Sequence, residues 1–241
     1  MQKRQGQLTF SPSDLTGYLA CPHLIQLERR VALGQLAKPE AENPEAELVK
    51  RKGEEHERAY LERLRAAGKT VAEISLEPDH DWERAARETR QAIEAQTDVV
   101  YQGVLVSDDG WRGIADFLER QADGTYEAVD TKLARHAKPA YILQLLFYSE
   151  ELARIQGREP ARMHVELGSG ERASYRPDEF AAYYRRLRSR YGVDPDDPMP
   201  DADVRVVLVV RPTTLLARSP AAGGPPAIER VTGERRTVYR P

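Results

Sequence analysis

The sequence predicts an α/β fold in which a central mixed β-sheet is flanked by helices. Three observations predict it. Three consecutive segments have strand-like composition and are joined by tight turns, helical segments precede and follow them, and a further hairpin comes after the last of these helices. Because helices on the faces of a sheet cover its apolar side chains, this order of elements favours one layered α/β core.

The first part of the chain predicts helices. Residues 11–30 begin with serines that can cap a helix and with Pro12, which suits a first turn, and they carry an apolar stripe at helical spacing. A second helix is expected from about residue 44 to 67, where Glu, Arg and Leu dominate, and Gly68 is a plausible stop.

The middle of the chain predicts a sheet. A short strand is expected at residues 70–76, followed by a helix that Asp81 caps and that reaches about Gln96. Asp-Asp-Gly and Ala-Asp-Gly sequences then separate three further strands as hairpin turns. These strands are expected at residues 99–106, 111–120 and 126–133.

The last elements alternate helix and strand. A helix is expected over residues 139–156, with Pro139 near its first turn and Gly157 past its end. A hairpin of residues 162–167 and 172–175 follows, and a closing helix runs from Asp178 to about Arg190.

The composition changes after Tyr191, where Asp-rich and Pro-rich breaks begin. Residues 204–210 could form one more strand, whereas residues 211–241 contain much Pro, Gly, Ala and Arg with little periodicity, which indicates disorder. We therefore divide the chain into a folded domain at 1–192 and an irregular tail at 193–241, disordered or aberrant.

Composition limits the function classes. The formal net charge is −3 and the pI is about 6.0, which argues against a generic polyanion binder, so that any positive charge for nucleic acid must be local. No apolar run approaches the roughly 18 residues of a membrane span, and the first nine residues lack a secretory signal. With a single cysteine, Cys21, an internal disulfide is excluded, and we expect a cytoplasmic protein without a membrane partner.

Two neighbouring strands carry the residues that predict chemistry. Asp130 and Lys132 are two apart, so they point to the same face of a strand, and in a suitable register Asp116 of the preceding strand lies beside Asp130. Two converging carboxylates suit Mg²⁺ or Mn²⁺, and a lysine beside them can hold an attacking water and a scissile phosphate. Taken alone, Asp-x-Lys is common and could belong to an ordinary surface hairpin.

With its context, the sequence resembles the PD-(D/E)xK nuclease superfamily and, within it, the RecB-like nucleases of the branch related to CRISPR-associated and AddB-type nucleases. The resemblance covers roughly residues 8–190. Four weak motifs occur in the family's order, together with the Ser-Pro-Ser-Asp-Leu and Tyr-Leu-Ala-Cys-Pro segments near the start. The motifs are Gly53 to Glu57, Gly113 to Asp116, Asp130 to Lys132, and Gln144 to Tyr148.

The resemblance implies a restriction-endonuclease-like core and a role for each matched residue. Asp116, Asp130, the Thr131 carbonyl and His56 would be metal ligands, although a lone helical histidine is more often a solvated surface residue. Lys132 would activate the water, Gln144 would orient the active site, and Tyr148 would contact nucleic acid or brace its helix, where an aromatic is more often core.

Positive charge directly follows the strand that carries Asp130. Arg135 and Lys138, with His136 between them, could hold a phosphate backbone, or they could belong to a solvated loop; we weigh the two equally. Arginines near residue 190 end a helix, where the helix dipole explains part of their presence.

The sequence departs from the family in one respect. Many members of this branch hold an iron–sulfur cluster with one cysteine in the N-terminal helix and three after the nuclease core. Cys21 matches the first, but the chain has no other cysteine, so we expect no cluster here. A truncated, frame-shifted or diverged C-terminus would explain the mismatch.

The sequence therefore predicts a nuclease that uses Mg²⁺ or Mn²⁺ to hydrolyse phosphodiester bonds of DNA in repair or recombination. Its partners would be DNA and, as in relatives, a helicase or RNase-H-like domain. Two alternatives stay open: a catalytically inactive nucleic-acid-binding or scaffold domain that retains the nuclease fold, and an unrelated α/β binding protein whose motifs match by chance.

Overall fold

The computed structural model describes residues 1–4, 6–38, 44–190, 215–219 and 227–231. The chain separates into two compact units, residues 1–193 and residues 194–241. This division lies one residue from the boundary expected from the sequence, while the function assigned to each part stays a prediction.

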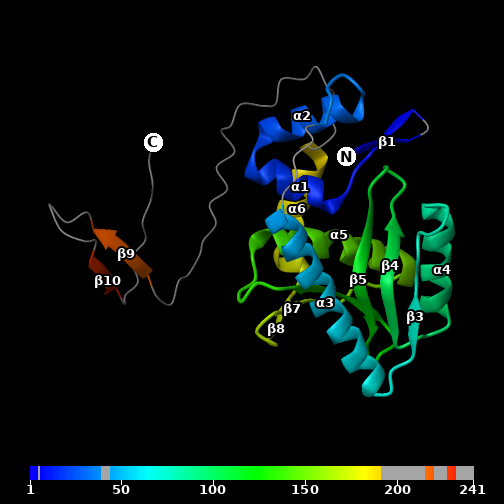
Figure 1. The fold of residues 1–241 in the computed structure, drawn as a ribbon. Helices are drawn as coiled ribbons and strands as arrows, with labels where there is room; N and C mark the ends of the chain where they lie inside the picture. Colours follow the sequence, from blue (N-terminus) through cyan, green and yellow to red (C-terminus); the bar gives the residue numbers. More distant parts are fainter. Residues whose placement is uncertain (5, 39–43, 191–214, 220–226, 232–241) are drawn as a thin grey trace. The chain divides into compact units, whose positions relative to one another are not determined.

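The first unit is an α/β domain with a mixed six-stranded sheet flanked by helices (Figure 1). The strand order is β3-β4-β5-β6-β7-β8, in which β3–β4 and β6–β7 are parallel and the other neighbours antiparallel. The strands are β3 (Val71–Glu73), β4 (Val99–Val106), β5 (Arg112–Arg120), β6 (Tyr126–Lys132), β7 (Met163–Leu167) and β8 (Arg172–Tyr175).

Two helices make the crossovers that parallel neighbours require. One joins β3 to β4 and the other joins β6 to β7. The helices of this unit are α1 (Pro12–Ala20), α2 (Pro22–Ala32), α3 (Pro44–Ala66), α4 (Trp82–Glu94), α5 (Pro139–Gln156) and α6 (Ala181–Arg190), with a 3₁₀ turn at Pro177–Glu179.

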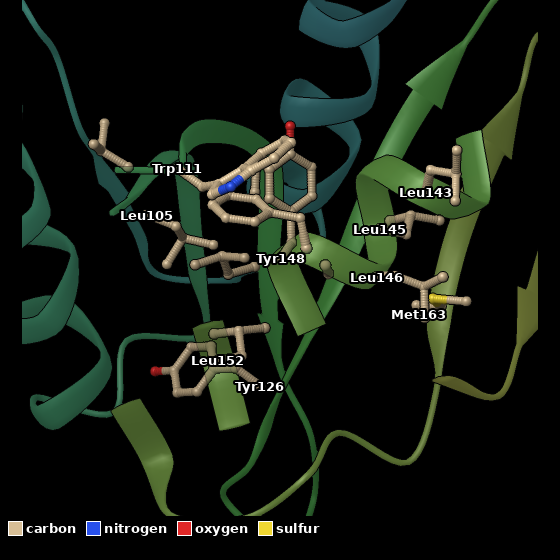
Figure 2. Close-up of a cluster of buried hydrophobic side chains, with 14 of the residues drawn as sticks. Leu105, Trp111, Tyr126, Leu143, Leu145, Leu146, Tyr148, Leu152 and Met163 are labelled. Atoms are coloured by element: carbon tan, nitrogen blue, oxygen red, sulfur yellow. The ribbon is translucent and has the colours of Figure 1, made fainter. Parts of the chain in front are cut away.

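Apolar side chains form two buried clusters. The smaller one lies under α3, where Tyr60 and Leu61 pack against Phe117 and Val129 of the sheet. The larger one includes side chains of α4, α5 and the strands, and Figure 2 shows part of it, with Leu152 of α5 beside Tyr126 and with Leu143, Leu145 and Leu146 of the same helix on the side of Met163. Strands β5 and β6 therefore lie between two packed layers, which fixes the residues that they carry.

The N-terminal region differs from the prediction in two ways. The helix expected over residues 11–30 is two helices, because Cys21 has an extended backbone (φ −161°, ψ 105°) and Pro22 begins a new helix with no N–H to continue the first. A short hairpin of β1 (Gln2–Arg4) and β2 (Gln7–Thr9), which we did not predict, precedes them. Three-residue strands are too short to show a period.

Smaller corrections concern element ends. The strand expected at residues 70–76 is limited to Val71–Glu73. The closing helix begins at Ala181 rather than Asp178, because Pro177–Glu179 forms a separate 3₁₀ turn. None of the described helices is long and apolar enough to cross a membrane.

The second unit contains a hairpin where irregular chain was predicted. Within its described residues, β9 (Leu215–Ser219) pairs antiparallel with β10 (Ala227–Val231), so the expectation of disorder over 211–241 is wrong for these two segments. Leu, Ile and Val favour strands even inside a Pro- and Gly-rich stretch. The strand expected at 204–210 lies outside the described residues.

Candidate active site

The site begins where β5 and β6 stop pairing. Their last described ladder pair is Phe117 with Val129, and one further step of the same register sets Asp116 opposite Asp130. Instead of a ladder bond, the Oδ2 atom of Asp116 accepts hydrogen bonds from the backbone N–H of Thr131 at 2.7 Å and from its hydroxyl at 2.8 Å. The Asp116 carboxylate therefore occupies the opening between the strands.

Asp130 and Lys132 lie on the same face of β6, as their spacing predicts. Lys132 Nζ is 2.7 Å from Asp130 Oδ2, and Asp130 is only 3% exposed. Burial raises the pKa of Asp130 to about 7, the negative charge of Asp116 adds to the increase, and Lys132 opposes it. The pocket thus disfavours the charged form of Asp130 in spite of its contact with Lys132.

Lys132 supplies a fixed positive charge in the pocket. Burial alone would lower the pKa of its ammonium group, but the charges of Asp130 and Asp116 outweigh burial and raise that pKa above its usual value. The ammonium also lies 5.5 Å from the centre of the Tyr141 ring of α5. Lys132 therefore stays charged at neutral pH and is held from two sides.

A third acidic group, Glu57 of α3, faces the pocket, and the sequence reasoning did not assign it a role. Burial raises the pKa of Glu57, and the charge of Asp116 raises it further. Its carboxylate accepts a hydrogen bond from Gln102 of β4, whose backbone is left-handed (φ 56°). Glu57 is the last residue of the Gly53–Glu57 motif, and this motif is the feature of the sequence that could have indicated its place at the site.

His56, the neighbouring residue on α3, points to a different strand. Its Nε2 atom lies 3.4 Å from the backbone carbonyl of Glu166 in β7, and Glu166 is the register partner of Thr131. His56 thus lies above the same stretch of β6 as the two aspartates but contacts the far strand. Its ligand role stays a prediction.

The two predicted residues of α5 differ in their surroundings. Gln144 is partly buried on this helix. Tyr148 is 5% exposed, and its hydroxyl donates a 2.8 Å hydrogen bond to the Ile114 carbonyl of β5. Its ring packs so close to Gly113 that a Cβ atom there would lie 2.9 Å from it. In this position Tyr148 braces α5 against the strand that carries Asp116, which is one of the two roles expected of it; a contact with nucleic acid stays a prediction.

The loop after β6 keeps positive charge at the surface. Arg135 and Lys138 are both exposed, and within the ranges that the structure describes neither forms an ion pair. The same loop is pinned near its start, because a Cβ atom on Gly168 would lie 2.5 Å from the Leu133 carbonyl oxygen. The backbone that follows Lys132 therefore has little freedom to move toward β7.

Residues that could hold a metal are oxygen donors. The described residues contain no ready-made group of three or more His, Cys, Asp or Glu side chains placed for a metal ion. Asp116 and Asp130 nevertheless meet at one opening with the Thr131 main chain between them. Carboxylate and carbonyl oxygens are the donors that Mg²⁺ and Mn²⁺ prefer, so the donor chemistry fits these ions.

The fold and site together define an α/β domain with a buried acidic cluster and a lysine at the divergence of two central strands. No protein-family model matches the sequence, and no curated protein sequence is significantly similar to it.

Proposed function

We propose that the domain is a divalent-metal-dependent nuclease with a restriction-endonuclease-like core, which hydrolyses phosphodiester bonds of DNA in repair or recombination. The observation that carries the proposal is the meeting of Asp116, Asp130 and Lys132 where β5 and β6 separate. Strongly shifted pKa values that arise from burial and like charges are typical of functional sites.

A small number of carboxylates is compatible with magnesium. Mg²⁺ usually keeps several waters and takes only one or two protein carboxylates together with substrate phosphates. Asp116, Asp130 and the Thr131 carbonyl would hold it here. Such an ion lowers the pKa of a bound water and offsets the negative charge of a phosphate.

The chain's own groups then have separate tasks. Lys132 Nζ can donate hydrogen bonds to the attacking water and to a phosphate oxygen, while the pairing of Asp130 with Lys132 fixes the direction of the ammonium. Thr131 orients Asp116 through two hydrogen bonds to a single oxygen, Oδ2. Tyr148 keeps β5 and α5 together behind the site.

The proposal is tested with purified protein and labelled single- and double-stranded DNA in Mg²⁺ or Mn²⁺. We expect cleavage that EDTA stops and that Asp130→Asn and Lys132→Ala each reduce at least about a hundredfold, since several kcal/mol of transition-state stabilisation are lost. Lys69→Ala, at an exposed position before β3, is the matched control and should cut normally. Intact DNA across both metals would remove the proposal.

A non-catalytic nucleic-acid-binding domain is the second candidate. It is favoured by the pairing within the site, since Lys132 already contacts Asp130 and Thr131 already binds Asp116. This candidate predicts DNA binding in EDTA, no cleavage in any metal, and the same affinity for wild type and Asp130→Asn.

A further inference from the structure

A wide groove lies at the opposite end of β5 from its hairpin to β6. It has a volume of about 1240 Å³ and is lined by the β1–β2 hairpin, the start of α4 and the turn between β4 and β5. Arg112, the first residue of β5, lines the groove together with Arg4 and Trp82.

Arg112 is a buried cation without an acidic partner among the described residues. It is 9% exposed, and its Nη2 atom donates to two neutral oxygens, Thr9 Oγ1 at 2.7 Å and Gln2 Oε1 at 3.0 Å. The guanidinium lies 4.6 Å from the centre of the Trp82 ring. Burial lowers the pKa of Arg112, and the positive charge of Arg4 lowers it further. A buried charge left in this state favours an anion.

A second buried arginine, Arg188, has acidic partners that balance its charge. Arg188 is also 9% exposed, but its guanidinium contacts both carboxylate oxygens of Asp109, at 2.6 and 2.8 Å, and Glu150 as well. Of two otherwise comparable arginines, only Arg112 lacks an acid, and it is the one that faces the groove.

The acidic groups that line the groove do not supply the missing charge. Asp81 caps α4 through the Arg84 N–H at 2.9 Å, and Asp109 is engaged by Arg188. Glu83 and Asp108 are exposed, where water screens their charges. The groove thus combines a fixed, desolvated cation with a second arginine and acidic groups that are already engaged or solvated.

We propose that this groove binds a phosphate of a nucleic-acid strand, with Arg112 as the phosphate ligand and Arg4 beside it. Arginine suits phosphate because its planar group can donate two hydrogen bonds at once. Arg112 precedes Asp116 by four residues on β5, about 13 Å at roughly 3.3 Å per residue, or about four nucleotides of B-form rise. The choice of nucleic acid over a small phosphate rests on the proposed nuclease function.

The experiment measures fluorescence polarisation of a labelled single-stranded oligonucleotide in EDTA, where no cleavage can occur. Arg112→Gln should weaken binding about tenfold, the size expected for a lost hydrogen bond to a charged group. It should also reduce the slope of log affinity against log salt by about 0.7. Arg120→Gln, at the other end of β5 where Asp98 already pairs with the arginine, is the matched control and should bind as wild type.

Arg4→Gln keeps the test decisive if Arg112→Gln is poorly folded by circular dichroism. Arg4 is exposed and its guanidinium donates a long hydrogen bond, 3.4 Å to the His80 carbonyl, so its loss should spare the fold and weaken binding about threefold. Wild-type affinity in Arg112→Gln, where that variant is folded, or in Arg4→Gln, where it is not, would overturn the proposal.

Two further measurements distinguish a nucleic-acid strand from free phosphate as the ligand, and distinguish the groove proposal from the nuclease proposal. Inorganic phosphate that competes with Arg112-dependent binding only at high concentration supports a strand ligand. If inorganic phosphate binds only when Arg112 is present, while both variants bind the oligonucleotide as the wild type does, the nucleic-acid assignment would be overturned. Cleavage in Mn²⁺ is measured separately. If the wild type cuts DNA while both groove variants bind it normally, only the groove proposal is overturned. If binding depends on the groove but no cleavage occurs, only the nuclease proposal is overturned.

Discussion

Two buried acids lie three residues apart on β6, and their surroundings differ. Glu127 is 5% exposed, and both of its oxygens have partners: His164 Nε2 at 2.8 Å and the Arg162 N–H at 2.8 Å. Asp130 is 3% exposed and shares one lysine with further acidic groups. Burial of an acid therefore does not identify a functional site. What distinguishes Asp130 from Glu127 is the like charge of Asp116 beside it, which adds to the effect of burial on its pKa.

The largest effect on the free energy of unfolding is expected at Glu127, the acid of β6 whose two oxygens both have partners. His164→Ala should lower the free energy of unfolding by about 3 kcal/mol, because it leaves the Glu127 carboxylate buried with one partner fewer. Urea denaturation in EDTA measures this. Ser174→Ala removes only the exposed hydroxyl on the other side of the His164 ring and should cost about 0.5 kcal/mol or less. Equal losses in the two variants would contradict the comparison.

A bound metal ion should stabilise the domain at Asp130, toward the other end of β6. If Asp116 and Asp130 hold Mn²⁺, free metal at about one hundred times its Kd should stabilise the wild type by about 2.7 kcal/mol. The gain should be larger at pH 8 than at pH 6, because Asp130, with a pKa of about 7, must lose its proton to bind. Thermal unfolding with and without metal measures it. His164→Ala should keep the gain and Asp130→Asn should lose it; a gain retained in Asp130→Asn would place the ion elsewhere.

The pH dependence of the metal-free protein follows from the same aspartate. The folded state keeps the Asp130 proton up to about pH 7, whereas the unfolded chain releases it near pH 3.8. Stability linked to this group is therefore present at low pH and is lost as the pH rises through about 7, and about 3 kcal/mol of that loss falls between pH 5 and pH 8. Urea titrations in EDTA from pH 5 to pH 8 should show the loss in the wild type. A slope equally steep in Asp130→Asn would assign it to other groups.

The smallest effect concerns the brace behind the site. Tyr148→Phe removes the hydrogen bond to the Ile114 carbonyl and should cost about 1 kcal/mol of stability with oligonucleotide affinity unchanged. Denaturation and polarisation on the same preparation test both halves. A loss of affinity at unchanged stability would support the nucleic-acid contact that the sequence predicted.

The sequence predicted elements where local chemistry decides the conformation. Strand β4 and helix α5 have the predicted bounds, because Asp-Asp-Gly closes the first and Pro139 and Gly157 frame the second. Gly110 and Gly124 have φ of 85° and 82°, as their turns require. The break at Cys21 and Pro22 was overlooked because the apolar stripe continues across it.

The site was predictable to the extent that strand geometry determines it. The two-residue period places Asp130 beside Lys132, and a short hairpin brings Asp116 opposite. Glu57 depends on how α3 is rotated about its axis over the sheet, which no local pattern specifies. The mixed parallel and antiparallel order likewise arises from contacts between distant segments, of which β6 with β7 is one.

The close approach of Gly168 to Leu133 has a consequence for substitutions far from any charge. Any side chain at Gly168 must displace the main chain directly after Lys132, since its Cβ would lie 2.5 Å from the Leu133 oxygen. The glycine between β7 and β8 thus sets the angle at which the lysine enters the pocket. If the domain is the proposed nuclease, a random screen for inactive but well-expressed variants should therefore recover changes at this neutral turn alongside those at the acidic residues.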